Sequence, residues 1–121
     1  MNSHKDLDVW KDAILIAKRV YEITENVPRR EEFGLAAQMR KSAVSIGSNI
    51  AEGAARRGNK EFLQFLYVAL GSASELDTQL EIARLVKLVP DESIVGVATN
   101  LSAISRMLQG LIRSIKAESG K

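Results

Sequence analysis

The chain has 121 residues, a net charge of +2, hydrophobic residues at 45% and no cysteine. This length suffices for one hydrophobic core, and the mixed composition argues against a disordered chain. Without cysteine, disulfides and zinc–thiolate sites are excluded. We therefore expect a single domain over residues 1–121, with short flexible ends at about 1–6 and 117–121.

Composition also predicts the fold class and the location of the protein. Aromatic residues make up only 5% of the chain and prolines number two, which favours an all-α protein. The charged N-terminus lacks the apolar run of a signal peptide, and no stretch is long and apolar enough to span a bilayer. These features predict a cytoplasmic protein without a membrane partner.

The first helix is predicted from about residue 9 to 25. Asp6 and Asp8 stand where an N-cap is expected, and Pro28 ends the segment. Residues recurring at three- and four-residue steps predict one buried face: Trp10, Ala13, Ile14, Ala17, Val20, Tyr21 and Thr24.

The second helix is predicted from about residue 31 to 55. Its apolar spacing places six residues on one face: Leu35, Met39, Ala43, Ile46, Ile50 and Ala54. A polar stripe adjoins that face: Gln38, Ser42, Ser45, Asn49, Glu52 and Arg56. Gly47 and Ala51 lie on the opposite flank.

Two further helices are predicted at about 60–88 and 91–117. Gly58 and Asn59 indicate a helix stop followed by an N-cap, and Pro90 with Asp91 forms the next turn. Their core positions are Phe62, Leu66, Ala69, Ala73, Leu76, Leu80 and Ala83, then Ile94, Val97, Ala98, Leu101, Ile104, Leu108, Leu111, Ile112 and Ile115. Four helices with short connections predict an antiparallel up-down-up-down four-helix bundle.

The small residues inside the helices require a structural explanation, because each interior glycine lowers helix stability by about 1 kcal/mol relative to alanine. One interpretation is close packing within a subunit, through Gly47, Ala51, Gly71 and Ala73. The other is close approach of a helix from a second subunit. Apolar residues left outside the core would then contribute to the subunit interface, such as Val44, Leu63 and Leu85.

Polar residues repeat a three-residue spacing on the second and third helices. Asn49 with Glu52, and Ser72 with Glu75, are predicted to hold these helices in register through a hydrogen-bonded network. No histidine lies nearby, no nucleophile is paired with a base, and no glycine loop has phosphate-binding spacing. We therefore predict a non-enzymatic protein without cofactor or metal.

The most basic window of the chain runs from residue 40 to 60. It holds five cations against the single acid Glu52: Arg40, Lys41, Arg56, Arg57 and Lys60. They are either solvated surface residues with local ion pairs or contacts for nucleic-acid phosphates. Because Phe62 and Phe65 are assigned to the core, such binding would depend on shape and charge instead of base stacking.

Three stretches carry a resemblance to a known family: DLDVWKDA at 6–13, the run at 34–80 and LSAISRMLQGLIRSI at 101–115. The most specific elements are SIGSNIAEG at 45–53 and GSASELDTQL at 71–80. With them the chain resembles the four-helix-bundle proteins encoded by intervening sequences of 23S rRNA genes. The resemblance spans nearly the whole chain.

The resemblance implies a compact bundle that assembles as a homopentamer. It also implies a relationship to the accessory variability protein of diversity-generating retroelements, which works with a reverse transcriptase and binds nucleic acid. The leading hypothesis is therefore an oligomeric bundle that binds RNA or DNA through the basic residues. The alternative is an oligomeric protein scaffold whose arginines are merely solvated.

Overall fold

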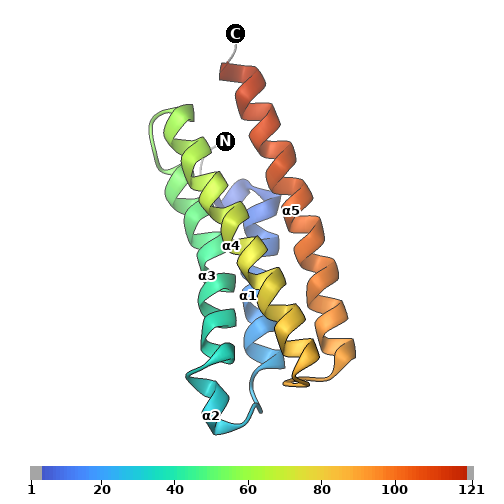
Figure 1. The fold of residues 1–121 in the computed structure, drawn as a ribbon. Coiled ribbons are helices and arrows are strands. Elements are labelled where there is room, and N and C mark those ends of the chain that lie inside the picture. Colours follow the sequence, from blue (N-terminus) through green and yellow to red (C-terminus); the bar gives the residue numbers. More distant parts are fainter. Residues whose placement is uncertain (1–3, 120–121) are drawn as a thin grey trace.

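The structure is a computed structural model that describes residues 4–119. Four long helices pack against one another: α1 (Asp8–Ile23), α3 (Leu35–Ala54), α4 (Asn59–Leu85) and α5 (Asp91–Ser119). Two short helical segments precede α1 and α3, namely η1 (His4–Asp6) and α2 (Arg29–Glu32). The long helices alternate in direction, and no strand occurs in the described part of the chain, so the predicted all-α bundle is confirmed (Figure 1).

The helix boundaries differ from the prediction in three places. The second predicted helix is divided, because Gly34 has a non-helical backbone that separates α2 from α3. Leu7 and Gly58, not the predicted aspartates and Asn59, occupy the N-cap positions of α1 and α4. Residues 4–6 form a helical turn and α5 continues to Ser119, so these parts of the predicted flexible ends are helical, while residues 1–3 and 120–121 lie outside the described residues.

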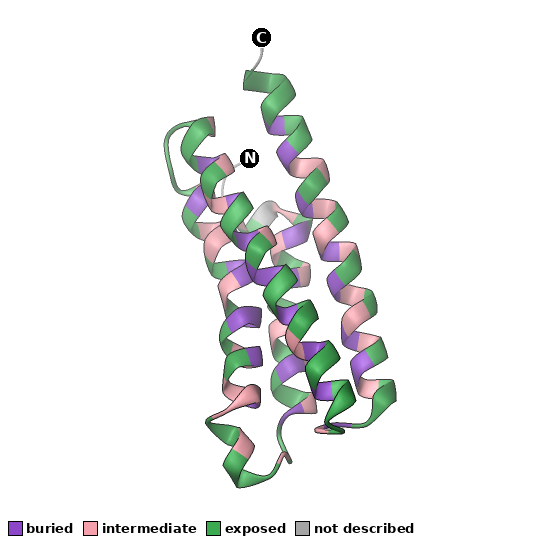
Figure 2. Cartoon of the chain, in the orientation of Figure 1, coloured by how far each residue is buried: buried purple, intermediate pink, exposed green. Residues whose placement is uncertain are grey.

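The core lies between the four long helices (Figure 2). The seven predicted core positions of α4 named above, from Phe62 to Ala83, are buried, whereas Leu63, Phe65 and Leu70, which the pattern adds to the core, are half-buried. In α3 and α5 the predicted face is buried apart from half-buried residues at its edge: Leu35, Ala54, Ala98 and Leu111. Each of these helices therefore has the orientation that its apolar period predicts.

Helix α1 is rotated relative to the prediction. Its buried residues are Val9, Ala13, Ile16 and Val20, and the predicted core residues Ile14 and Tyr21 are 45% and 50% exposed. The helix carries apolar residues on more than one side, so the period alone did not identify the side that packs against α3 and α5.

Candidate interaction surfaces

A polar network joins α3 to α4, as the sequence predicts for Asn49 and Ser72. The hydroxyls of Ser45 and Ser72 share a hydrogen bond of 2.8 Å. The side-chain amide of Asn49 donates to the Ser45 hydroxyl at 2.9 Å and to the Ser45 carbonyl at 2.8 Å. Ser45 is therefore the centre of the network, although the sequence placed it only on the polar stripe. Its role depends on Ser72, a neighbour 27 positions away.

The two glutamates assigned to this network lie outside it. Glu52 is exposed and accepts a hydrogen bond of 3.0 Å from Arg56, one helical turn away. Glu75 is exposed on α4, and within residues 4–119 it has no hydrogen-bond or ion-pair partner. Neither carboxylate therefore sets the register between α3 and α4.

Arg40 is engaged in a contact within the bundle. Its Nε donates to Thr24 Oγ1 at 2.9 Å and its Nη2 to the Thr24 carbonyl at 3.0 Å, and the guanidinium lies 5.0 Å from the centre of the Tyr21 ring. Thr24 follows the last residue of α1 and is fully buried. Arg40 therefore caps the C-terminus of α1, where cations and hydrogen-bond donors are favourable.

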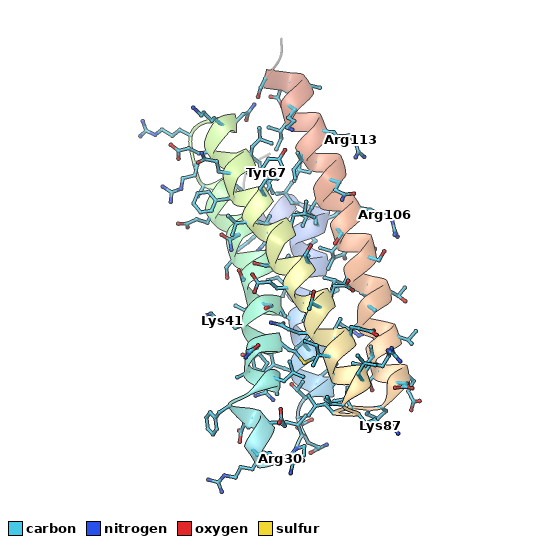
Figure 3. The ribbon with its side chains drawn as sticks, viewed as in Figure 1. Arg30, Lys41, Tyr67, Lys87, Arg106 and Arg113 are labelled. Carbon is cyan, nitrogen blue, oxygen red and sulfur yellow. The ribbon has the colours of Figure 1, made fainter. Side chains whose placement is uncertain are left out.

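The other predicted phosphate contacts are distributed along the bundle. Arg56, Arg57 and Lys60 are exposed at the turn between α3 and α4, at the opposite end of α3 from Arg40. Arg56 pairs with Glu52, and its guanidinium lies 4.9 Å from the centre of the Phe65 ring. Lys41 points away from the middle of α3 (Figure 3). The structure thus brings together only the three cations at the turn.

One further cation belongs to that end of the bundle. The ammonium of Lys116 on α5 lies 5.4 Å from the centre of the Tyr67 ring on α4. The Asn59 amide donates to Ser119 Oγ at 3.2 Å, which places the end of α5 beside the start of α4. Lys116 is not predicted from the sequence, because it lies more than fifty positions from the basic window. We call Arg56, Arg57, Lys60 and Lys116 the basic end.

The helix-interior glycines have different environments. A Cβ on Gly53 would lie 2.7 Å from Phe65 Cβ and 3.0 Å from Phe62 Cδ1, and a Cβ on Gly47 would lie 3.2 Å from Ile14 Cδ1. Both glycines allow close packing inside the subunit, as the first interpretation predicts for Gly47; Gly53 was not part of that prediction. Gly71 is exposed, and a Cβ there would meet no atom within 4 Å. Packing inside the subunit therefore does not explain why residue 71 is a glycine.

The outward face of α4 carries Gly71 in a regular stripe. Residues at alternating steps of three and four lie on this face, and we call them the α4 ridge: Val68, Gly71, Glu75, Thr78 and Ile82. Val68 and Ile82 are 51% and 44% exposed, and Leu85, one step further, is 66% exposed. The exposed face of α4 is turned toward the viewer in Figure 2. The ridge has apolar ends, and its centre is formed by Gly71, Glu75 and Thr78.

A hollow runs between this ridge and α3. Two adjoining cavities of about 380 and 480 Å³ share Gln38, Glu75 and Gln79 in their walls. The Oε1 atom of Gln79 is buried and has no hydrogen-bond partner among the described residues.

A second hollow lies between α1 and α3. This cavity of about 310 Å³, the α1–α3 groove, has ten lining residues, of which all but His4 and Ser48 are apolar or glycine. Its lining includes Trp10, Ile14, Ala17, Ala43, Val44, Gly47 and Ala51. The exposed side chains of Ile14 and Val44 stand on opposite sides of it. Its lining is mostly apolar in the part of the chain that the structure describes.

The charges of α4 are partly paired locally. Arg84 donates a hydrogen bond to Glu81, which holds the pKa of the Glu81 carboxyl below its usual value, and the same contact raises the pKa of Arg84.

Within the part of the chain that the structure describes, no group of three metal-ligating side chains occurs. No helix there is both long and apolar enough to cross a bilayer.

The sequence of the chain identifies the family to which it belongs. The sequence profile of the 23S rRNA-intervening sequence protein family matches residues 5–110. The chain belongs to this family. The match covers α1, α3, α4 and most of α5, so the resemblance predicted from the SIGSNIAEG and GSASELDTQL stretches is confirmed.

A solved structure agrees with the fold of this 23S rRNA-intervening sequence family member. A crystal structure of a protein with unknown function from the S23 ribosomal protein family of Bacteroides thetaiotaomicron is similar, with a TM-score of 0.81 and 23% sequence identity. The similarity covers 87% of this chain and 95% of that chain. At this identity the similarity shows the fold alone. A comparison with curated proteins gives no match.

Proposed function

We propose that this protein is a non-enzymatic, self-associating helical bundle that acts as a scaffold through the outward face of α4. The observation that carries the proposal is Gly71, an exposed glycine in the middle of a 27-residue helix with nothing within 4 Å of its Cβ position. A helix-interior glycine costs about 1 kcal/mol relative to alanine, and close approach of another helix offsets that cost.

The surroundings of Gly71 favour a helix as the partner. Val68 and Ile82 would bury apolar surface on either side of the close approach. Of the predicted interface candidates, Leu85 extends the apolar area on α4, Val44 is exposed at the hollow between α1 and α3, and Leu63 is half-buried in the bundle. The family resemblance favours five copies.

The test is the mass of the protein in solution by light scattering. We expect wild type to be a multiple of the 13.3 kDa chain, and Val68→Asp to shift it toward the single-chain mass. Gln109→Asp is the matched control, because Gln109 is exposed on α5 away from the ridge. A monomeric wild type at micromolar concentration contradicts the proposal.

A second candidate function is nucleic-acid binding at the basic end. Arg57, Lys60 and Lys116 have no acidic partner within residues 4–119, and they lie together where α3 ends, α4 begins and α5 ends. Several cations free to contact phosphates give affinity that falls steeply with salt.

Titration with labelled duplex DNA and structured RNA at low and moderate salt tests this function. We expect salt-sensitive binding, with Arg57→Ala and Lys60→Ala each reducing the salt slope by about one. Lys18→Ala on α1 is the control, because that exposed lysine is remote from the basic end. Absence of binding at low salt contradicts this function and leaves the scaffold.

A further inference from the structure

We infer that the hollow between α3 and α4 is a binding site for a small zwitterion, such as a polar free amino acid, held between Lys41 and Glu75. All residues of the hollow belong to one chain, so the inference goes beyond the proposed scaffold and does not require self-association. Three features of the hollow support it: a layered polar lining, two opposite charges on facing helices, and a buried hydroxyl without a hydrogen bond.

The lining of the hollow is almost entirely polar. Its larger cavity, of about 480 Å³, is lined by seven polar side chains and by the apolar side chain of Val68. The polar residues are Gln38, Lys41, Ser42, Ser45, Ser72, Glu75 and Gln79. The volume is within the range of pockets that hold small ligands. None of these lining residues is aromatic, so the cavity fits a polar molecule better than a flat apolar one.

The lining residues lie at three levels along the two antiparallel helices (Figure 1). Ser45 and Ser72 form the first level, because their hydroxyls share a hydrogen bond of 2.8 Å. One helical turn away, toward the start of α3 and the end of α4, lie Lys41 and Glu75. The two glutamines of the lining form the third level, a further turn along. The hollow therefore has a hydroxyl end, a charged centre and an amide end, over a length of about 10 Å.

The charged centre places opposite charges on facing helices. Lys41 is exposed on α3, and Glu75 is exposed on α4 at the same level. Within residues 4–119 neither side chain has an ion-pair or hydrogen-bond partner, and the two do not pair with each other. A zwitterion satisfies both, because its carboxylate accepts from the Lys41 ammonium and its own ammonium donates to the Glu75 carboxylate. A ligand with only one sign of charge satisfies only one of them.

Ser42 supplies a hydrogen-bond donor inside the hollow. The residue is 5% exposed and lines the cavity, and its hydroxyl makes no hydrogen bond within residues 4–119. Hydroxyls inside helices can donate to the carbonyl four residues earlier, as those of Thr78 and Thr99 do in this chain. A buried hydroxyl without such a bond is unfavourable, and a ligand carboxylate beside Lys41 provides an acceptor for it. The carboxylate of the ligand is therefore assigned to the α3 wall.

Titration with one zwitterion and two singly signed compounds tests the inference. L-Glutamine is the probe, because it carries both charges and an amide group, whereas succinate has only carboxylates and putrescine only ammonium groups. Isothermal titration calorimetry up to about 10 mM compound covers weak complexes with dissociation constants near 1 mM. We expect L-glutamine to bind one site per chain, at least about tenfold more tightly than either of the other compounds.

Two charge-removing variants locate the site. Lys41→Gln and Glu75→Gln should each weaken L-glutamine binding by about tenfold or more, because each removes one charged hydrogen bond. Lys18→Gln on α1 and Asp77→Asn on α4 are the matched controls, since these exposed residues do not line the hollow. If all four variants bind like wild type, the ligand lies elsewhere and the inference is wrong.

Ser42→Ala distinguishes a binding role from a structural one. The variant should weaken L-glutamine binding without lowering the melting temperature, because the hydroxyl contributes no hydrogen bond to the fold within the described residues. A lower melting temperature with wild-type affinity would mean that Ser42 is structural, which contradicts its assignment to the site.

Light scattering on the same samples keeps the inference distinct from the proposed scaffold. Wild type is titrated beside Leu85→Asp, which alters the exposed end of α4 and no residue of the hollow, so that assembly does not hide the site. If neither protein binds L-glutamine over the titrated range, the inference is wrong, and any assembly of wild type stands. If wild type binds and has the single-chain mass, the proposed scaffold is wrong and the inference stands. Equal binding of succinate or putrescine contradicts the inference, because one sign of charge would then suffice.

Discussion

One glycine lies at each face of α4, and the two glycines have different surroundings. On the inner face, Gly53 of α3 brings the two helices together, since a Cβ there would lie 2.7 Å from Phe65 Cβ. On the outer face, Gly71 has empty space at the same position. Both residues are glycines within predicted helices, and only the structure distinguishes a subunit-internal contact from an uncovered surface. The stability changes predicted below refer to the dissociated chain in dilute solution, except where assembly itself is measured.

The largest difference is expected between apolar residues on the two faces. Leu76 is fully buried, so Leu76→Ala should lower the free energy of unfolding by about 2–5 kcal/mol through lost burial and a cavity. Ile82→Ala on the ridge should change it by less than about 0.5 kcal/mol, as surface substitutions usually do. Urea denaturation measures both values. Equal losses would mean that Ile82 belongs to the core.

Gly53→Ala should destabilise the fold even though alanine favours helix. The added methyl group overlaps Phe65 Cβ and the Phe62 backbone carbonyl, which cannot move without displacing α4, and such overpacking costs about 1–3 kcal/mol. Thermal unfolding checks the sign. A stabilised Gly53→Ala variant would show that the α3–α4 contact is looser than described.

Ser72→Ala should lower the free energy of unfolding by about 1 kcal/mol, because Ser45 loses a partially buried hydrogen-bond partner. Ser74→Ala is the matched control on the exposed side of the same helix, where the hydroxyl has no hydrogen bond to α3 within residues 4–119. Chemical denaturation of both variants gives the difference. Equal free energies of unfolding for the two variants would mean that the network does not stabilise the contact between α3 and α4.

Gly71→Ala should have the smallest effect and the opposite sign. Alanine fits without contact, so the isolated chain should gain up to about 1 kcal/mol of stability from helix propensity. The same methyl group should weaken assembly, because it fills the recess that a partner helix would occupy. Thermal melting and light scattering on one sample measure both effects. If the variant gains stability and assembles like wild type, Gly71 is not part of the interface.

The sequence predicted the fold well because apolar periodicity is a local property. The stripe of α4 from Phe62 to Ala83 points to one side, and its predicted core residues are buried apart from half-buried ones beside the stripe, such as Phe65. The stripe of α1 was ambiguous, because Ile14, Leu15 and Tyr21 add apolar surface outside the buried face. Which side of α1 is buried depends on how α3 and α5 lie around it, and local spacing does not contain that information.

The candidate sites were predicted less well because they depend on partners distant in the sequence. Arg40 stands next to Lys41 in the basic window, yet it caps α1 through Thr24, whereas Lys41 is exposed. Lys116 joins the basic end only because α5 returns to the start of α4. Ser45 became the centre of the polar network through Ser72 on the neighbouring helix. Charge density along the chain identifies none of these neighbours.

The short turn between α3 and α4 has a consequence for how the chain folds. Residues 55–58 connect two helices that already share Gly53, Ser45 and Ser72 as contacts, so closing this hairpin restricts few residues. The contact between α1 and α5 joins segments at opposite ends of the chain and closes a much longer loop. We therefore expect the α3–α4 hairpin to form early in folding and α1 to dock onto the surface that this hairpin and α5 provide.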